Sequence, residues 1–257
     1  MIHIEALEQR FDTASGPVQA LTGVDLTIDR NEFVTLVGRS GCGKSTLLRI
    51  IAGLQRPTGG GVTIDGDPVT GPREDVGMMF QRPALLPWRN VIQNIMLPVE
   101  IMRLDRREAQ ERAAALIELA GLTGFERKMP HELSGGMQQR VSLCRSLVSN
   151  PKILLMDEPF SALDALTREE LSVELQRIVM ETNTTIVFVT HSIEEAVLLA
   201  DRVVVMKARP GRVREVVPVE IPRPRSLGNS EYGELVTSVS GHLHDLLQDT
   251  HEQEAAA

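Results

Sequence analysis

The stretch that decides the fold is residues 33–53, which read FVTLVGRSGCGKSTLLRIIAG. It opens with apolar, mostly β-branched residues typical of a buried strand, and it closes with apolar residues at the spacing of one helix face. Between them stands the pattern G-x-x-x-x-G-K-S, at residues 38–45. A strand, a glycine-rich loop and a helix in this order predict a loop that binds the phosphates of a nucleoside triphosphate.

Each residue type in this loop has a chemical reason. Gly38, Gly41 and Gly43 let the backbone turn with its N–H groups inward, where they and the helix N-terminus hold phosphate oxygens. Lys44 is expected to reach the β- and γ-phosphates, and the Ser45 hydroxyl to ligate Mg²⁺. The other loop residues expected to line the nucleotide are Ser40, Cys42 and Thr46. The alternative, a glycine-rich turn before an ordinary helix, leaves the Lys-Ser pair unexplained.

Length and composition limit the class of protein. A chain of 257 residues suits one large α/β domain, with or without a small appendage. The net charge of −8 excludes an overall basic field that would attract nucleic acid or anionic lipid. Two cysteines, Cys42 and Cys144, are too few for a disulfide framework and favour a reducing cytoplasm.

No segment resembles a signal peptide or a membrane span. The first residues, MIHIEALEQRF, alternate apolar and charged side chains, unlike a signal peptide. No apolar run approaches the ~18 to 20 residues that cross a bilayer. If the protein works at a membrane, we expect another chain to supply the spans.

A pair of carboxylates follows a second buried strand. Residues 153–156 (ILLM) are continuously apolar, as in a central parallel strand, and Asp157 and Glu158 come next. Two carboxylates at such a position are expensive to desolvate unless a cation or a reacting water uses them. We therefore predict that the Asp157 carboxylate binds on the Mg²⁺ side and that Glu158 is the general base. The alternative is two solvated loop carboxylates.

Gln81 and His191 also come at the ends of predicted strands, residues 76–80 and 185–190. Ligand groups of open α/β sheets collect at the carboxyl ends of their strands, which makes both residues site candidates. A lone histidine is otherwise more often structural. Ser192 and Glu195, which follow, predict a capping box.

Ser134, Gly135 and Gly136 precede a helix expected from residue 138 to about residue 149. Ser134 is a good N-cap residue. Two glycines in a first turn cost ~1 kcal/mol each relative to alanine, so something must require bare backbone there. A phosphate brought against the helix N-terminus is the predicted reason, and a plain helix start is the alternative.

The remaining chain gives coarser predictions. Ile2, Ile4 and residues 24–28 alternate with polar neighbours and predict strands beside the strand of the phosphate-binding loop. Phe11 either stacks adenine or is a lone core or hinge aromatic. Residues 92–121 predict a mostly helical insertion, interrupted at Pro98.

These motifs occur together in one order. The sequence contains GRSGCGKST, Gln81, LSGGM, ILLMDEP, the residues Ser161, Ala162, Leu163 and Asp164, and then His191. Over residues 1–222 this set resembles the ATP-binding cassette (ABC) ATPases. The resemblance implies an α/β P-loop nucleotide-binding domain with a RecA-like core, an N-terminal antiparallel β subdomain and a helical subdomain inserted at about residues 82–150. Residues 223–257 would form a tail, with an amphipathic helix pattern at 234–248.

The resemblance also implies a role for each candidate residue. Phe11 would stack the adenine of ATP, Gln81 would sense Mg²⁺ and the γ-phosphate, and His191 would contact the γ-phosphate. In this family two copies pair head to tail, so Ser134, Gly135 and Gly136 of one copy would complete the ATP site of the other. Residues 161–164, Asp164 among them, would lie at the dimer seam. The chain has Met137 where the family commonly has glutamine, and we expect little effect.

Finer motifs narrow the branch. Residues 84–88 (ALLPW), 164–168 (DALTR) and 208–212 (ARPGR) resemble importer ATPases of the nitrate, sulfonate and taurine group. Such a subunit would hydrolyse ATP at the cytoplasmic face of the membrane, with transmembrane permease subunits contacted near residues 81–88 and a solute-binding protein acting indirectly. Trp88 is either this contact or an ordinary buried aromatic.

Two other functions remain as alternatives. A soluble ABC ATPase in DNA repair or translation usually has a coiled-coil insertion, a metal site or a second cassette, and the acidic balance disfavours nucleic acid. A pseudo-enzyme that only binds ATP is disfavoured because Glu158 and His191 are both present.

Overall fold

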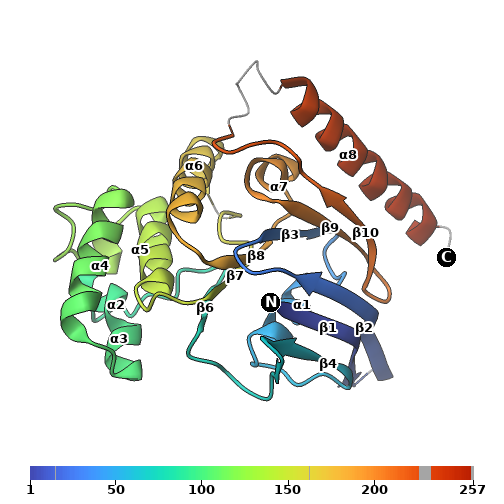
Figure 1. The fold of residues 1–257 in the computed structure, drawn as a ribbon, viewed down its shortest axis with the longest axis horizontal. Helices are drawn as coiled ribbons and strands as arrows, with labels where there is room; N and C mark the ends of the chain where they lie inside the picture. Colours follow the sequence, from blue (N-terminus) through green and yellow to red (C-terminus); the bar gives the residue numbers. More distant parts are fainter. Residues whose placement is uncertain (15, 162, 226–232, 256–257) are drawn as a thin grey trace. The chain divides into compact units, whose positions relative to one another are not determined.

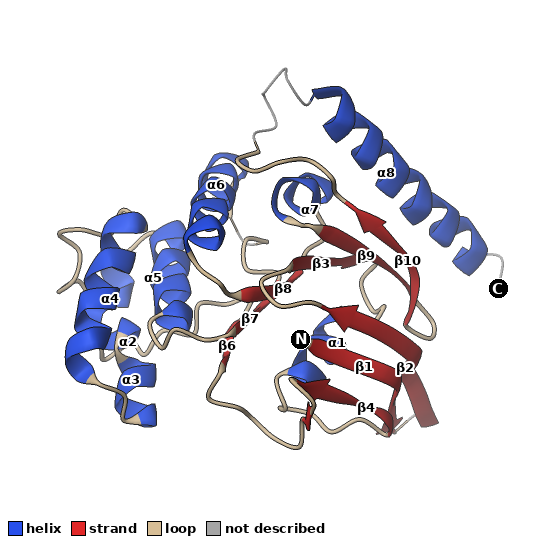
Figure 2. Ribbon diagram, in the orientation of Figure 1, coloured by secondary structure: helices blue, strands red, loops and turns tan. Residues whose placement is uncertain are grey.

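The structure, a computed structural model, describes residues 1–14, 16–161, 163–225 and 233–255. Its contacts divide the chain into two compact units. Unit 1 comprises Met1–Arg73 and Thr185–Ala257, and unit 2 comprises Glu74–Thr184. Figure 2 shows that strands dominate the first residues of unit 1 and that helices dominate the middle of the chain. Within the described residues, no helix combines the length and apolar character that a bilayer crossing requires.

The first sheet of unit 1 is antiparallel, in the order β2-β1-β4-β5. Its strands are β1 (Ile2–Thr13), β2 (Gly16–Ile28), β4 (Gly59–Ile64) and β5 (Asp67–Pro68). The prediction that the N-terminal strands lie beside the strand of the phosphate-binding loop is wrong, because β1 pairs with β2 and β4 in this separate sheet. Their apolar and polar alternation suits an antiparallel sheet with one buried face, whereas a central parallel strand is apolar on both faces.

The second sheet of unit 1 contains the strand that leads into the glycine-rich loop. Here the order is β10-β9-β3-β8, with β3 parallel to both of its neighbours. The strands are β3 (Phe33–Gly38), β8 (Thr185–Val189), β9 (Arg202–Lys207) and β10 (Arg212–Pro218). Every residue of β3 and β8 is buried, as the continuous apolar runs predict.

The described residues of unit 1 form three helices. They are α1 (Lys44–Ile51), α7 (Ile193–Leu199) and α8 (Gly233–Ala255). Figure 1 shows α8 running past α7 and β10, and α8 packs on α7 and β9. Leu243 and Leu246 of α8 are buried. Residues 226–232 and 256–257 of the predicted tail lie outside the described residues.

Unit 2 combines a parallel strand pair, β6 (Val76–Met79) and β7 (Ile153–Asp157), with a group of helices. The helices are α2 (Val91–Ile95), α3 (Leu97–Met102), α4 (Arg106–Leu119), the 3-10 helix η1 (Pro130–Glu132), α5 (Gly135–Leu147) and α6 (Ala165–Glu181). Their apolar faces meet in a core that includes Ile95, Ala113 and Val141. Pro98 lies in the first turn of α3, where its missing N–H costs nothing.

Candidate active site

The glycine-rich loop of unit 1 joins β3 to α1. Gly41 and Gly43 have φ values of 84° and 90°, which a side chain would strain. A Cβ on Gly43 would also lie 2.4 Å from Leu21 Cδ2, so the loop packs against β2. Gly43 is the N-cap residue of α1 and no side chain caps this helix. The N–H groups of its first turn therefore suit an anion.

Lys44 is fixed inside this loop. It is 6% exposed, and its Nζ donates to the carbonyl oxygens of Gly38 at 2.6 Å and Arg39 at 3.1 Å. Ser40 and Gly41 are exposed on the loop, while Ser45 and Thr46 are half-buried in the first turn of α1. The ammonium is thereby positioned before any phosphate arrives, which lowers the ordering cost of binding.

Cys42 is buried in the same loop, with its Sγ 3.6 Å from Lys44 Nζ. Burial raises the pKa of the Cys42 thiol, although the Lys44 ammonium acts in the opposite direction. The thiol is therefore neutral at pH 7. It does not cancel the positive charge that Lys44 presents.

Gly211 supports the loop from behind, and the sequence did not reveal this role. Its carbonyl accepts from Thr22 N at 2.9 Å, and its N–H donates to the Ala20 carbonyl at 3.0 Å. A Cβ on Gly211 would lie 2.3 Å from the Cys42 carbonyl oxygen. The Pro-Gly pair predicts a turn at this position, but only the tertiary structure shows what the turn touches.

His191 follows β8, the strand beside β3. Thr190 N donates to the Leu36 carbonyl at 3.3 Å, so the end of β8 lies next to the strand that enters the loop. His191 itself is exposed. Unit 1 thus brings His191 and the glycine-rich loop to the carboxyl ends of neighbouring parallel strands, as predicted for ligand groups.

The capping box predicted at the start of α7 is only half formed. Ser192 Oγ accepts from Glu195 N at 3.2 Å, as expected. The Glu195 carboxylate does not return to Ser192 N in the structure; it accepts from Thr190 Oγ1, and Ser192 N donates to that same hydroxyl at 3.0 Å. The Thr190 hydroxyl therefore takes the place that the Glu195 side chain has in a capping box.

Phe11 lies on β1 and is 39% exposed, opposite the exposed Val18 of β2. The alternative that Phe11 is a core aromatic is therefore wrong. An exposed aromatic ring has a face free for stacking on a planar ligand.

Unit 2 brings Gln81, Asp157 and Glu158 to one sheet edge, because β6 and β7 are parallel and Met79 pairs with Met156. Asp157 is 8% exposed. Glu158 has a φ of 46°, a left-handed conformation that is uncommon outside glycine and typical of functional sites.

A short chain of hydrogen bonds connects these candidates. Gln81 Nε2 donates to Ser161 Oγ at 3.1 Å, and Ser161 Oγ donates to the Glu158 carbonyl oxygen at 3.0 Å. Ser161 N donates to the same carbonyl at 3.2 Å. Ser161 therefore connects the side chain of Gln81 to the backbone of Glu158 by hydrogen bonds. Ala162, in the predicted motif at residues 161–164, lies outside the described residues.

The helix that follows Ser134 begins earlier than predicted, at Gly135. Ser134 is the N-cap residue as predicted, with its Oγ accepting from Met137 N at 3.2 Å. A Cβ on the buried Gly136 would lie 2.7 Å from Thr167 Cγ2, so packing alone accounts for this glycine. Among the described residues, apart from its chain neighbours and the backbone of its own helix, no atom lies within 4 Å of a Cβ built on Gly135, which is exposed together with Ser134. Ser134 and Gly135 are therefore open at the surface, while Thr167 fills the space beside the α-carbon of Gly136.

Asp164 is the N-cap residue of α6. Its Oδ1 accepts from Thr167 N at 3.0 Å and its Oδ2 from Thr167 Oγ1 at 2.8 Å. These hydrogen bonds, that of the Thr167 backbone first, lower the pKa of Asp164. Asp164 thus has a local structural role whether or not it also meets a second copy.

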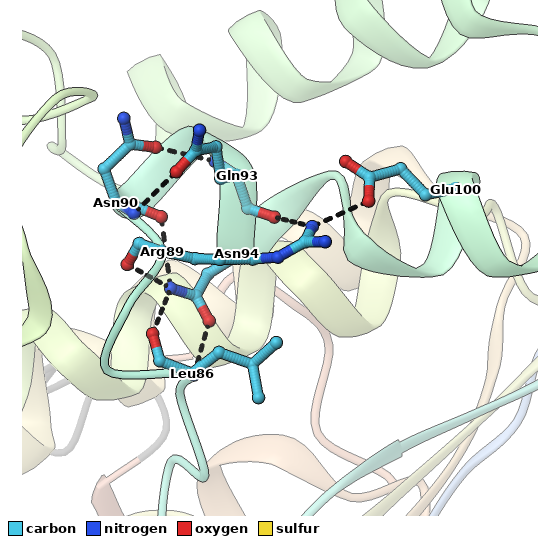
Figure 3. A network of polar contacts seen from close by, with 6 residues as sticks. All are labelled: Leu86, Arg89, Asn90, Gln93, Asn94 and Glu100. Atoms are coloured by element: carbon cyan, nitrogen blue, oxygen red, sulfur yellow. Dashed lines mark hydrogen bonds and ion pairs between the residues drawn. The ribbon is translucent and has the colours of Figure 1, made fainter.

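Trp88 is 70% exposed, so the alternative of an ordinary buried aromatic is wrong. Residues on both sides of it, Leu86 and Arg89, are hydrogen-bonded to Asn94, as Figure 3 shows. The buried Asn94 accepts from Leu86 N at 2.8 Å and donates to the carbonyl oxygens of Arg89 at 2.8 Å and Asn90 at 3.1 Å. The indole is thus presented to solvent on a pre-organised loop.

A family model described as "ABC transporter" matches residues 21–161. The chain belongs to the ABC transporter family. The uncharacterized ABC transporter ATP-binding protein MJ0412 of Methanocaldococcus jannaschii is 47% identical to it, over 95% of this chain and 91% of that protein. The aliphatic sulfonates import ATP-binding protein SsuB of Bacillus cereus is 40% identical, over 91% of this chain and 92% of that protein.

A longer relative and a solved structure complete the comparison. The nitrate import ATP-binding protein NrtC of Synechococcus elongatus is 47% identical over 86% of this chain, which spans 34% of that protein. The dimeric ATP-binding cassette MJ0796, in a post-hydrolysis state bound to ADP and Pi, is 33% identical. The two structures superpose with a TM-score of 0.75, and the match covers 86% of this ABC chain and 100% of the MJ0796 chain. The predicted fold class is confirmed.

Proposed function

We propose that this ABC protein is the ATP-hydrolysing subunit of an importer that takes up a small solute such as nitrate, a sulfonate or taurine through separate membrane subunits. The observation that carries the proposal is the pre-organised loop with its buried Lys44, in a chain that also has Glu158 after a buried strand. The names of the nitrate and sulfonate import relatives favour an importer over an ABC ATPase of DNA repair or translation.

In the proposed reaction, water attacks the γ-phosphorus in line with the leaving ADP. The loop N–H groups and Lys44 stabilise negative charge on the phosphate oxygens, and Glu158 takes a proton from the attacking water. His191 contacts the γ-phosphate, and the exposed ring of Phe11 stacks on adenine. The remaining residues assigned to the nucleotide are Gly38, Ser40, Gly41, Cys42, Gly43 and Thr46.

We assign Mg²⁺ to Ser45, Gln81 and Asp157. A hydroxyl, an amide oxygen and a carboxylate are the hard oxygen ligands that Mg²⁺ accepts, alongside phosphate oxygens and water. The buried Asp157 carboxylate supplies the negative charge of this set. When bound, the ion neutralises charge on the transferred phosphoryl group.

The proposed working form is a head-to-tail dimer. Ser134, Gly135 and Gly136 of one copy would face the ATP of the other, with Asp164 near the seam. The exposure of Ser134 and Gly135 at the start of α5 supports this assignment, as does the dimeric state of the MJ0796 cassette. Residues 1–222 would form the ATPase domain, with a helical subdomain at about 82–150, and residues 223–257 its tail.

The proposed setting is the cytoplasmic face of the membrane, where transmembrane permease subunits would contact residues 81–88. A solute-binding protein would act on the complex indirectly. The exposed Trp88 supports this contact, because the backbone on both sides of it is hydrogen-bonded to Asn94 and a pre-organised loop loses little entropy on binding.

Substitution of Glu158 tests the enzymatic proposal. The variant Glu158→Gln is expected to keep ATP affinity and to lose at least ~100-fold in kcat, because the general base is gone. Size-exclusion chromatography with ATP should then show a stable dimer. The control is Glu111→Gln, a carboxylate on α4 with 72% side-chain exposure, which should hydrolyse ATP like the wild type. An unchanged ATPase rate in Glu158→Gln would remove Glu158 from its role.

Substitution of Trp88 tests the partner contact. The variant Trp88→Ala is expected to weaken binding to the co-expressed permease subunits by about 2 kcal/mol, roughly thirtyfold in Kd, if the indole is an anchor. ATPase activity of the isolated chain should stay within about twofold of wild type, since a binding anchor takes no part in the chemistry. Ile101→Ala, at an equally exposed apolar residue of α3, is the control. Equal permease recovery by both variants would contradict the contact.

A further inference from the structure

Helix α5 makes a second set of contacts, besides those at its N-terminus, with the segment that contains Gln81. The side chain of Gln139 donates through Nε2 to the Gln81 carbonyl oxygen at 2.8 Å. The guanidinium of Arg145 donates to the Pro83 carbonyl at 2.6 Å and to the Ala84 carbonyl at 2.9 Å. Three successive bonds from one helix therefore hold the backbone of residues 81–84, termed here the Gln81 segment.

The Gln81 segment needs such support because it has no regular structure of its own. β6 ends at Met79, and Pro83 has no N–H to donate. Ala84 has a φ of 47°, a left-handed conformation that costs a residue with a Cβ ~1 kcal/mol or more. The planar guanidinium of Arg145 offers a separate nitrogen to each of the two carbonyls in a fixed geometry, whereas a lysine would have to reach both from one nitrogen on a flexible stem.

The two α5 side chains are themselves well fixed. Gln139 is 2% exposed, and Arg145 Nη2 also lies 3.4 Å from the hydroxyl of the buried Ser142. Arg145 is half-buried, and this burial lowers the pKa of its guanidinium. The Oε1 atom of Gln139 is buried and has no hydrogen-bond partner among the described residues. The buried Oε1 of Gln139 therefore lowers the stability of the fold, and the hydrogen bond from Nε2 to the Gln81 carbonyl is the one that its side-chain amide makes among the described residues.

At its other end the Gln81 segment runs into the loop of Trp88. Leu86 is bonded to Asn94 through both its N–H and its carbonyl, at 2.8 and 3.2 Å. Figure 3 shows this attachment to α2. The chain from Gln81 to Asn90 is therefore fixed at one end to α5 and at the other to α2.

We propose that Gln139 and Arg145 are positioning residues that fix the Gln81 segment to α5, so that Gln81 and the Ser134 end of α5 move as one body. The proposal rests on the proposed function, because it assigns Gln81 and Ser134 to the nucleotide. In a hydrolysing dimer, a displacement of Trp88 by a permease subunit would reach both Gln81 and the start of α5. Arg145 acts through the backbone that it holds and touches no reacting atom.

The test compares the full-length variants Arg145→Gln and Gln139→Met with wild type. In Arg145→Gln, amide hydrogen exchange of peptides covering residues 82–89 should rise about tenfold or more, while peptides of the glycine-rich loop stay unchanged. The kcat for ATP should fall about tenfold, with KM within about twofold, because Gln81 is misplaced but the loop that binds ATP is intact. The variant Arg145→Lys should recover part of both losses.

The matched control is Arg112→Gln, which removes another arginine of unit 2 that donates to a backbone carbonyl, that of Val148 at 3.0 Å. It should lower thermal stability without raising exchange at residues 82–89 or lowering kcat. If Arg145→Gln does not fold, Gln139→Met carries the test alone, because it removes a buried unsatisfied oxygen and is expected to fold. Its expected signature is faster exchange near Gln81 and a lower kcat.

Wild-type exchange at residues 82–89 in Arg145→Gln or Gln139→Met overturns the inference, and so does an equal loss of kcat in Arg112→Gln. These results would reject the positioning role of Gln139 and Arg145 without rejecting the proposed ATPase function. A wild-type chain without ATPase activity would reject the proposed function, while the exchange comparison would still decide whether α5 holds the Gln81 segment.

Discussion

At the scale of single residues, the glycine-rich loop depends on close backbone approaches that a single methyl group would disturb. Gly211 is the sharpest case, since a Cβ there would lie 2.3 Å from the Cys42 carbonyl and 2.6 Å from the Ala20 carbonyl. Both obstacles are backbone, so the loop itself must move. We expect Gly211→Ala to cost about 1 to 3 kcal/mol of stability by overpacking. It should also weaken ATP binding about tenfold or more, because the cradle around Lys44 is displaced.

The measurement is a titration with a fluorescent ATP analogue, together with thermal melting. Gly61→Ala is the matched control, because apart from the chain neighbours of this β4 residue no atom of the described residues lies within 4 Å of a Cβ built on it. That variant should bind ATP like the wild type and be as stable or slightly more stable. Equal ATP affinities for the two variants would mean that the loop tolerates a shift at Gly211.

At the scale of elements, α5 and α6 meet at a carboxylate that costs stability. Arg140 Nη1 of α5 lies 3.6 Å from Glu174 Oε1 of α6, and the Glu174 side chain is 14% exposed. Its other oxygen, Oε2, is buried with no hydrogen-bond partner among the described residues. Burial raises the pKa of Glu174, and the attraction of Arg140 does not compensate.

The sign of this pKa shift gives a prediction. A carboxyl whose pKa is raised in the folded state contributes stability below its ordinary pKa and loses it as the pH rises through the folded value. The variant Glu174→Gln should therefore melt at a higher temperature than wild type at pH 7 to 8. The difference should shrink as the pH falls towards the ordinary glutamate range.

Thermal melts at several pH values measure this effect. Glu170→Gln serves as the control, because that carboxylate is 56% exposed and lies 3.4 Å from the same Arg140. Removal of such a surface pair should change stability by no more than ~1 kcal/mol. A lower melting temperature of Glu174→Gln at pH 7 would show that the pair with Arg140 outweighs the desolvation of Glu174.

The same elements show what a sequence can and cannot predict. The glycine-rich loop, the buried strands and α4 follow from local patterns, since periodicity and composition determine them directly. The alternating pattern alone placed β1 and β2 beside β3, because alternation identifies a strand but not its neighbours; the separate antiparallel sheet was implied only by the family resemblance. The packing of Gly136 on Thr167, the support of the loop by Gly211 and the bonds from Arg145 all join residues that are distant in sequence. No local pattern contains them.

At the scale of the whole molecule, the proposed ATP site needs residues from two copies, which gives a test by mixing inactive chains. Lys44→Ala should inactivate the loop, and Ser134→Arg should block the facing helix start, so each variant alone should be inactive. In a mixed dimer, the intact loop of the Ser134→Arg chain meets the intact Ser134 of the Lys44→Ala chain. One of the two sites is then complete.

A 1:1 mixture should therefore recover about a quarter of wild-type ATPase activity if the sites act independently, because half of the dimers are mixed and half of their sites are complete in a head-to-tail pair. The ATPase rate is measured against mixing ratio, with a maximum expected at equal amounts. A double variant with Lys44→Ala and Ser134→Arg in one chain, mixed with Lys44→Ala, provides the control and should stay inactive, because no intact loop is left. Recovery that is absent at every ratio, while both variants still form dimers with wild type, would mean that each chain builds its ATP site from its own residues.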